Sequence, residues 1–374
     1  MSETPSPGEA GGSGGSAAEL RAVRRLHLRS WHLRRGAVLG VRRGSELPLH
    51  YGDADRELEA LHTGCALVDQ SDAGRLELLG ADRQRFLNGL LTVDVAALGE
   101  GQGAHGFATD GRGRILADVT LLAHADRLWL EAPAGREGTL AEHLLRYRVA
   151  DRVEVLPMED LLPLTLVGAG LEAALAGAGF EPPARAQRGL AHGRATWFGS
   201  EVHVAWSDRL GAPALEVWMS SSIAGLVADE LLERLGATPV GDDACEVLRL
   251  EAKVPRFGVD FDDTNLPGEV GTAGAVDWKK GCYLGQEIVA RMHYRGQPAR
   301  VLRRLRLEGE SLPAPGAAVI LEERPAGAVT SVARSPREGV LALAMVQRRA
   351  GDAGTTVLVE GAGPAQVEAV AGSE

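Results

Sequence analysis

The chain has 374 residues, of which 45% are hydrophobic, and this is enough for two or three hydrophobic cores. A formal net charge of −11 argues against a surface whose main task is to bind the phosphate backbone of nucleic acids. No stretch approaches the roughly 18 unbroken apolar residues of a membrane-spanning helix, and the N-terminus lacks the apolar core of a signal peptide. We therefore expect a cytoplasmic protein of several domains, without membrane contact.

The N-terminal residues 1–45 differ from the rest of the chain. A Gly/Ser-rich stretch comes first, and residues 21–43 then contain many arginines and no acid. Glu3, Glu9 and Glu19 speak against a mitochondrial presequence, so we expect a disordered tail followed by a basic surface segment. An RNA-binding role for this segment is an alternative, which the acidic net charge makes weak.

Two later stretches, about 46–155 and 156–297, share one order of elements: strand, helix, three strands, helix. In the first, strands are expected at 75–80, 104–109, 114–122 and 127–132, and helices at 81–91 and 138–149. In the second, strands are expected at 162–168, 193–198, 201–206 and 214–219, and helices at 171–179 and 221–236. Asp110-Gly111 between two of the strands is a strong hairpin signal. This order predicts an α+β fold of two lobes, each a mixed sheet with helices on one face.

The last part, 298–374, has a different pattern. Short apolar runs at 301–309, 317–323, 327–334, 339–346 and 355–361 alternate with Gly and Pro. Such spacing is typical of a small antiparallel β-barrel.

Several familiar motifs are absent or weak. There is no GxxxxGK[ST] phosphate loop, and the GxG that follows strand 162–168 lacks a third glycine in register, so we interpret it as a tight turn. His105, His124 and His143 have no HxH or HExxH companion. We expect each to be solvated or hydrogen-bonded, and no metal site is predicted.

Cysteine gives a stronger signal. Cys65, Cys245 and Cys282 lie far apart and form no CxxC pair, which fits a reducing compartment and no disulfide framework. Cys282 comes shortly before a helix expected at 286–295, where the helix dipole and the nearby Lys279 and Lys280 favour a thiolate. The alternative is a small buried side chain that only fills space.

The segment KGCYLGQE, together with VDWK before it and IVARMHYRG after it, closely resembles the KGC[FY]xGQE signature of the YgfZ family. These proteins are folate-binding relatives of the aminomethyltransferase (T protein) of the glycine cleavage system. The resemblance extends from about residue 46 to the end of the chain. Its motif residues here are Lys280, Gly281, Cys282, Tyr283, Gly285, Gln286 and Glu287.

The resemblance implies two lobes and a barrel around a hole that admits a reduced folate, tetrahydrofolate or a derivative. It places Glu216 where family members accept hydrogen bonds from the pterin ring, although strand pattern alone would equally allow an outward-facing residue. Asp118 matches one of two adjacent acids of the aminomethyltransferases, of which one helps catalysis, and Ala117 stands at the other position. Arg249 and Glu251 match a segment close to the folate site, or form an ion pair on a helix surface.

Two functions follow from this resemblance. The first is a folate-dependent factor that uses Cys282 to support the assembly or repair of iron–sulfur enzymes, including enzymes that thiolate tRNA. The second is an aminomethyltransferase with tetrahydrofolate as acceptor; the shared fold and Asp118 favour it, whereas Ala117 and the KGCYLGQE segment argue against it. Whether the chain catalyses a reaction is left open.

Overall fold

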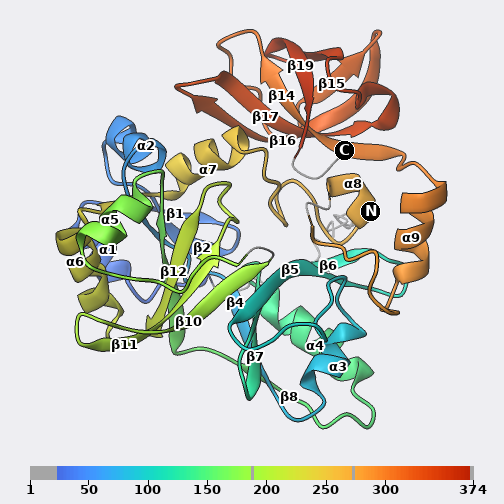
Figure 1. Ribbon diagram of the computed structural model, residues 1–374. Coiled ribbons are helices and arrows are strands. Elements are labelled where there is room, and N and C mark those ends of the chain that lie inside the picture. The colour runs from blue at the N-terminus through green and yellow to red at the C-terminus, as the bar shows by residue number, and fades with distance from the viewer. Residues whose placement is uncertain (1–22, 187–188, 272–273, 371–374) are drawn as a thin grey trace, which may run out of the picture.

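The structure, a computed structural model, describes residues 23–186, 189–271 and 274–370. Two lobes and a barrel surround a common centre (Figure 1). Within the described ranges, one eleven-stranded sheet runs through both lobes and the barrel is a separate closed sheet. None of the helices in these ranges is long and apolar enough to span a membrane. The predicted α+β fold with mixed sheets and a C-terminal antiparallel barrel is confirmed.

The first lobe contains the elements predicted for it. Its strands are β4 (Gly74–Leu79), β5 (Gln102–Thr109), β6 (Ile115–Ala123), β7 (Arg127–Ala132) and β8 (Glu154–Pro157), and its helices are α3 (Arg83–Asn88) and α4 (Glu137–Tyr147). Apolar residues of β6, β7 and the two helices form one buried cluster, because alternate strand residues face the helices. The short β8 was not predicted, and α3 ends before the predicted limit of 91.

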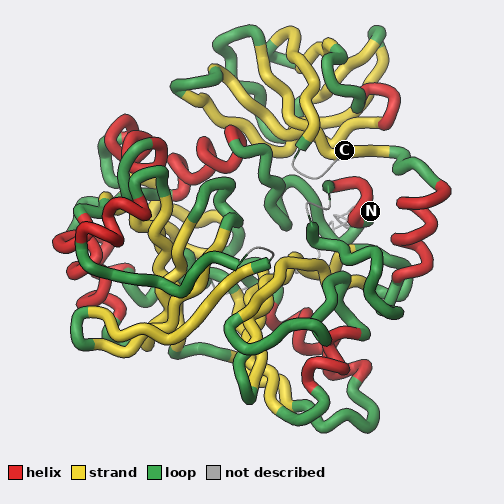
Figure 2. Tube along the Cα trace, in the orientation of Figure 1, coloured by secondary structure: helices red, strands yellow, loops and turns green. Residues whose placement is uncertain are grey.

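The second lobe repeats this order. Its strands are β9 (Leu161–Val167), β10 (Leu190–Trp197), β11 (Ser200–Ser207), β12 (Ala214–Ser220) and β13 (Thr238–Pro239), and its helices are α5 (Leu171–Gly177) and α6 (Ala224–Leu235). Gly236 ends α6 in a left-handed conformation with φ 61°. The helices of both lobes lie on the outside and the strands inside (Figure 2).

The N-terminal segment belongs to the second lobe, which differs from the predicted boundaries. It forms α1 (Arg29–Arg34), β1 (Val38–Arg42), β2 (Ser45–His50), α2 (Ala54–His62) and β3 (Ala66–Asp69). Strand β3 pairs with β9 and β13, and Trp31 of α1 packs into the core of the second lobe. The predicted tail ahead of residue 21 lies outside the described residues.

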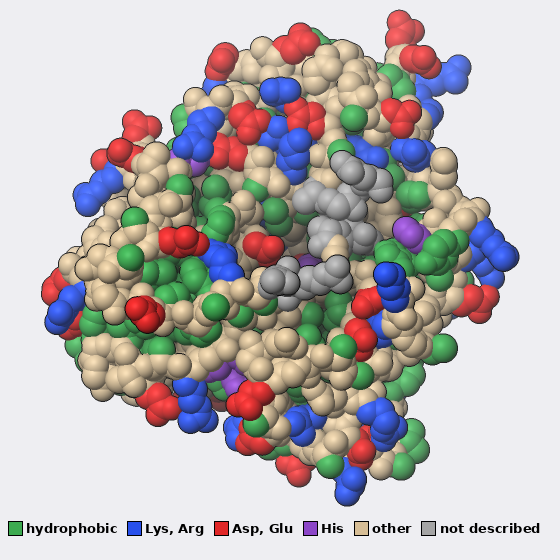
Figure 3. All heavy atoms as spheres, viewed as in Figure 1, with side chains coloured by type: hydrophobic (Ala, Val, Ile, Leu, Met, Phe, Trp, Pro, Cys, Tyr) green, Lys and Arg blue, Asp and Glu red, His purple; other side chains and the backbone are tan. Residues whose placement is uncertain are grey.

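The arginines of this segment are largely neutralised by acids. Ion pairs join Arg24 to Glu137, Arg29 to Glu46, Arg35 to Asp229, Arg42 to Asp242 and Asp243, and Arg43 to Asp242. Across the face seen in Figure 3, side chains of both charge signs are interspersed. The segment is therefore a folded part of the lobe and offers little free positive charge to RNA.

The two half-sheets join along one short seam. Strand β10 of the second lobe pairs with β5 of the first through Leu190 with Gly103 and Ala191 with Gln102. Two sheets were expected, but this pairing makes them one.

The connector and barrel complete the chain. The connector contains α7 (Asp242–Glu251), α8 (Pro267–Val270) and α9 (Gln286–Arg295). The barrel contains β14 (Arg300–Leu307), β15 (Ala318–Leu321), β16 (Arg324–Ser335), β17 (Gly339–Gln347), β18 (Thr356–Val359) and β19 (Gly363–Ala369), with a 3₁₀ turn at Arg348–Ala350. Strand β19, which was not predicted, closes the barrel between β14 and β18. Leu250 of α7 packs on Leu302 and Leu341, so α7 ties the second lobe to the barrel.

Candidate functional site

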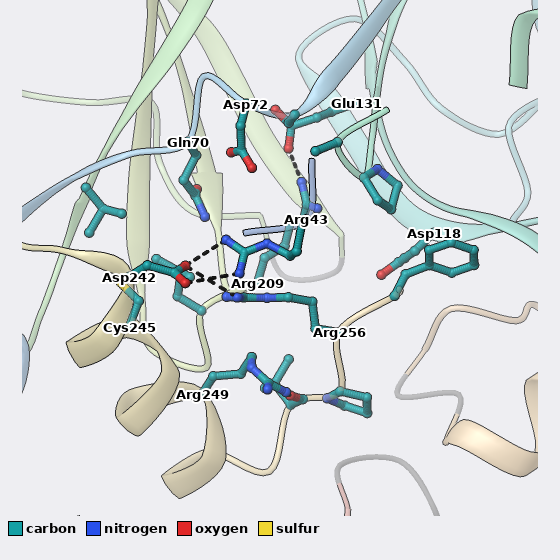
Figure 4. Close-up of a pocket in the computed structure, with 18 of the residues that line it drawn as sticks. Arg43, Gln70, Asp72, Asp118, Glu131, Arg209, Asp242, Cys245, Arg249 and Arg256 are labelled. Carbon is teal, nitrogen blue, oxygen red and sulfur yellow. Dashed lines mark hydrogen bonds and ion pairs between the residues drawn. The ribbon is translucent and has the colours of Figure 1, made fainter. Parts of the chain in front are cut away.

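A cavity of about 290 Å³ lies where the two lobes meet α7 and the connector (Figure 4). Both lobes contribute to its wall: Gln70 follows β3 of the second lobe, whereas Asp118 on β6 and Glu131 on β7 come from the first. Gly271 and Ala275 of the connector also line it. The position matches the hole between the lobes that the sequence resemblance implied.

One side of the cavity is aromatic. The rings of Phe107 and Phe257 each stand edge-on to Phe261, with centroids 6.3 and 5.5 Å from it. All three side chains are buried and line the cavity. This side suits a flat ring system, because aromatic groups pack well on the edges and faces of other rings.

The rest of the wall is strongly charged, with more acids than bases. The acids are Asp69, Asp72, Asp118, Glu131, Asp208 and Asp242, and the guanidinium groups are those of Arg43, Arg209, Arg249 and Arg256. An excess of carboxylates does not suit a ligand with several phosphates. It suits a ligand that presents N–H donors.

Arg209 pairs with Glu131 in the wall, and its charge also acts on Glu216. The guanidinium of Arg209 donates to Oε1 of Glu131, whereas the second oxygen of Glu131, Oε2, has no hydrogen-bond partner among the described residues. Burial and the charge of Glu131 raise the pKa of Glu216 to about 7, against the opposing effect of Arg209. Oε2 of Glu216 accepts from Nε1 of Trp218 at 3.1 Å.

Glu216 is buried and is not part of the cavity wall, although Glu131 and Arg209 of the wall act on its carboxyl group. It lies opposite Thr165 on β9, whose hydroxyl donates to Gln70 at 2.7 Å. Since directly opposed residues share one face of a sheet, Glu216 is on the side that faces the cavity. Its predicted contact with a pterin ring is not tested by this arrangement.

Asp118 faces the cavity and Ala117 does not. Successive strand residues point to opposite faces, so Ala117 packs into the first lobe's core while Asp118 hydrogen-bonds to Nε2 of His105. Burial opposes its charge, but His105 and Arg209 hold the pKa of Asp118 below its ordinary value. Burial acts against His105 also, yet Asp118 raises the pKa of its imidazole. Each member of the pair thus favours the charged form of the other.

Asp242, at the start of α7, forms ion pairs with arginines that line the cavity. Arg43 donates to both of its oxygens, at 2.7 and 3.1 Å, and Arg256 lies 3.6 Å away. Asp72 differs, because among the described residues its carboxylate has no side-chain hydrogen bond or ion pair. Burial raises the pKa of Asp72, which Arg43 only partly offsets. Its carboxylate is thus available to a ligand.

Arg249 and Glu251 lie in different surroundings. Arg249 lines the cavity but is fully buried, and it donates to Asp260 at 2.6 Å and to Ser331 of the barrel at 2.9 Å. Glu251 is not in the wall; it pairs with His62 at 2.7 Å and accepts from Ser335 at 2.5 Å. The two residues therefore have different partners, and both lie at the junction of the second lobe with the barrel.

The KGCYLGQE segment is fastened to the first lobe by its lysine. Nζ of Lys280 is buried and donates to the backbone carbonyls of Asn88, Leu91 and Val93 at 2.6 to 2.7 Å. Burial lowers the pKa of Lys280 to about 8. The predicted role of Lys280 was to favour a thiolate at Cys282, whereas the ammonium group is here engaged with carbonyls.

Other motif residues also shape the loop. Gly285 precedes α9 with φ 82°, and a Cβ there would collide with the carbonyl oxygen of Asp110. Tyr283 is buried, and Glu287 is exposed and pairs with Arg291 at 2.7 Å. Helix α9 has the predicted bounds, but Ile288 and Met292 are only half-buried and Val289 alone is fully covered.

Cys282 is the exposed member of the three cysteines. Cys65 and Cys245 are buried, and burial raises the pKa of the Cys65 thiol to about 12. Cys282 is not part of the cavity wall, although Ala275 on the same connector is. The connector thus presents one accessible thiol, that of Cys282. This thiol does not lie with Asp118 in the cavity wall.

Sequence reasoning missed His105, Asp72, Arg209 and Glu131. These side chains come from separate strands and loops, and only the pairing of β5, β6 and β7 and the joining of the lobes bring them together. The available signal was strand alternation, which puts His105 and Phe107 on the face of β5 that looks toward Asp118.

Two family models match the chain. The GCVT N-terminal domain matches residues 28–280, and the glycine cleavage T-protein C-terminal barrel domain matches residues 300–372. Among solved structures, the glycine cleavage system aminomethyltransferase T from Bartonella henselae superposes with a TM-score of 0.84 at 25% identity, covering 92% of this chain and 96% of that one.

Similar curated proteins carry two different names. An aminomethyltransferase from Rubrobacter xylanophilus is 32% identical over 325 residues, which is 85% of each chain. A tRNA-modifying protein YgfZ from Cronobacter sakazakii is 29% identical over 256 residues, covering 67% of this chain and 74% of that protein. The two levels of similarity are close, so identity alone does not choose between the two roles.

Proposed function

Because the chain belongs to the glycine cleavage T-protein family, we propose that its cavity binds a reduced folate, tetrahydrofolate or a derivative. Carboxylates support this, since a pterin ring presents adjacent N–H donors. Asp72 lines the cavity, and neither its carboxylate nor Oε2 of Glu131 has a side-chain partner within the described part of the chain, so both can accept from a ligand. The edges of Phe257 and Phe261 would contact the flat rings. A bound reduced folate supplies one-carbon chemistry.

For the role of the whole protein, we favour a YgfZ-like factor that supports iron–sulfur enzymes through Cys282. The observation that supports this role is that some motif residues fix the loop while its cysteine stays exposed. Lys280, Tyr283 and Gly285 hold the loop in place, whereas the Cys282 thiol is exposed and, within the described ranges, bonded to nothing. A motif built in this way presents a sulfur to an incoming molecule.

That molecule must complete the chemistry. A thiolate binds iron or other soft metals, but one sulfur falls short of the four thiolates usual for a cluster. Cys282 would therefore share iron or a cluster with a client protein, and enzymes that modify tRNA are a client class consistent with the name of the YgfZ relatives. This role does not require the chain to bind tRNA directly, and the negative net charge of the chain disfavours such binding.

Folate binding is tested by calorimetry with 5-formyltetrahydrofolate on the full chain. Asp72→Asn should weaken binding roughly 10- to 100-fold, because it removes a charge-assisted hydrogen bond of about 1.5–3 kcal/mol. Asp55→Asn, at an exposed position in the first turn of α2, is the matched control and should bind like the wild type. Absence of binding by the wild type would end the proposal.

The role of the thiol is tested by complementation of a strain that lacks the protein. Cys282→Ser should retain folate affinity and fail to restore the activity of iron–sulfur enzymes. Glu287→Gln changes an exposed residue of the same motif and should restore it. Full restoration by the serine variant would remove the sulfur from the mechanism.

Aminomethyl transfer is the second candidate, and one observation favours it. Only position 118 of the paired acids faces the cavity, so Ala117 in the hydrophobic core is a weaker objection than the sequence suggested. Formation of methylene-tetrahydrofolate from an aminomethyl-loaded lipoyl carrier protein, lost in Asp118→Asn, would establish this activity. No formation above the uncatalysed rate would exclude it.

A further inference from the structure

Three histidines meet at the seam between the lobes, away from the cavity. His124 follows β6 of the first lobe, and His192 and His203 lie on β10 and β11 of the second. One ring nitrogen from each lies within 4.8 Å of the other two. Nδ1 of His192 and Nε2 of His203 are 2.9 Å apart. In Figure 1, β10 lies between β11 and the strands of the first lobe.

The backbone fixes the tautomer of His192. Its Nε2 lies 3.1 Å from the carbonyl oxygen of Gln102, and because a carbonyl only accepts, Nε2 carries the proton. Nδ1 therefore presents a lone pair toward His203. Metal-binding histidines almost always donate their second ring nitrogen to a carbonyl or carboxylate in this way.

His124 contributes a nitrogen without a partner. Its Nε2 is buried and has no hydrogen bond among the described residues, which is rare for a buried polar atom. The ring is held by Trp129, with centroids 4.2 Å apart, and lies 4.8 Å from both His192 and His203. A metal ion between the three rings would satisfy this nitrogen.

His192 and His203 are buried, and His124 is half-buried. Burial lowers the pKa of all three, to about 4 for His124 and about 3 for His203. A cation at this point would meet lone pairs that cannot all be used in hydrogen bonds among imidazoles.

We propose that His124, His192 and His203 form a binding site for a transition-metal ion of the Zn²⁺ class. Three imidazole nitrogens are a common ligand set for zinc with a fourth position open, whereas Mg²⁺ and Ca²⁺ require oxygen ligands. The fourth position faces a groove of about 750 Å³ that the three rings line. A water molecule or a small anionic ligand takes that position.

The ion would join the two lobes. His124 belongs to the first lobe and the other two ligands to the second, at the short seam where β10 pairs with β5 through Leu190 and Ala191. Binding to the folded seam should therefore raise the melting temperature of the protein. This inference is independent of folate binding and of Cys282.

The test is metal uptake by the full chain after removal of any affinity tag and treatment with a chelator. The wild type should bind one equivalent of Co²⁺ with the intense visible absorption of four-coordinate cobalt, and Zn²⁺ should displace it. His124→Gln, His192→Gln and His203→Gln should each weaken binding by more than the roughly 10–100-fold that loss of an outer-shell partner costs. His27→Gln, at an exposed position, is the matched control and should bind like the wild type.

Folding is followed in parallel by circular dichroism. His124 is only half-buried, so His124→Gln should fold and should lose the rise in melting temperature that Zn²⁺ gives the wild type. A folded wild type that binds no Co²⁺ would overturn the proposal. Equal binding by the wild type and by a folded His124→Gln variant would also overturn it, because the ion would then lie elsewhere.

Discussion

The imidazole of His105 and the carboxylate of Asp118 form a hydrogen-bonded ion pair between neighbouring strands at the cavity wall. They are not directly opposite, since Asp118 faces Phe107 and His105 faces Thr120 in the register of β5 and β6. The pair therefore forms along a diagonal of the sheet, which is within reach of these side chains. It places a proton donor and an acceptor at one point of the wall.

Asp118→Asn should lower the pKa of His105. The carboxylate raises that pKa at present, and its removal leaves burial and Arg209, both of which disfavour the imidazolium. An NMR pH titration of the His105 ring would measure the change. An unaltered His105 curve in the variant would show that the two groups are not coupled in solution.

Glu216→Gln should stabilise the protein at alkaline pH. The pKa of Glu216 is raised from 4.5 to about 7, so the folded state binds more protons than the unfolded state between these values and stability falls as pH rises through them. The amide removes this loss, which amounts to roughly 3 kcal/mol above pH 7 at 1.36 kcal/mol per pKa unit. It can still accept from Trp218.

Urea unfolding of both proteins at pH 5 and pH 8 measures this difference. The variant should exceed the wild type at pH 8 and approach it at pH 5, where Glu216 is protonated in the folded state. Equal unfolding free energies at both pH values would mean that Glu216 is not held in a desolvated, carboxylate-rich position.

Local patterns in the sequence predicted those elements whose structure depends on neighbouring residues. Helix α9 has the predicted bounds, and the Asp110-Gly111 turn joins β5 to β6 as expected. Periodicity and turn chemistry act over a few residues, and they can be read directly.

The site depended on long-range pairing that sequence spacing does not encode. The three histidines at the seam are brought together by the contact of β10 with β5, and their separation along the chain gives no ligand motif. The addition of β3 to the second lobe likewise depends on packing of Trp31 and Leu67 with the core of β9 and β12. A lysine such as Lys280 cannot be recognised as a structural residue until its three distant carbonyls are known.

Lys280→Met should destabilise the fold, although the residue belongs to the functional motif. The substitution leaves the carbonyls of Asn88, Leu91 and Val93 without their donor, and we expect a loss of about 3 kcal/mol in the free energy of unfolding. Lys279→Met is the control, because Lys279 is exposed and its backbone alone bonds to Asp277; the change there should be below about 0.5 kcal/mol. Urea unfolding compares the two. Similar losses in both would place the ammonium of Lys280 in solvent.

Cys282 should be the thiol that reacts in the native protein. Cys65 and Cys245 are buried, and the burial that raises the pKa of both thiols also shields them from reagents, whereas Cys282 is exposed. The reagent DTNB should therefore modify one thiol before unfolding and all three after it. Cys282→Ser should remove the native reaction and leave the free energy of unfolding within about 0.5 kcal/mol of the wild type, since an exposed side chain contributes little packing. A native reaction that persists in this variant would locate the accessible sulfur at Cys65 or Cys245, and a sulfur-based role for the KGCYLGQE loop would then have no reactive group to support it.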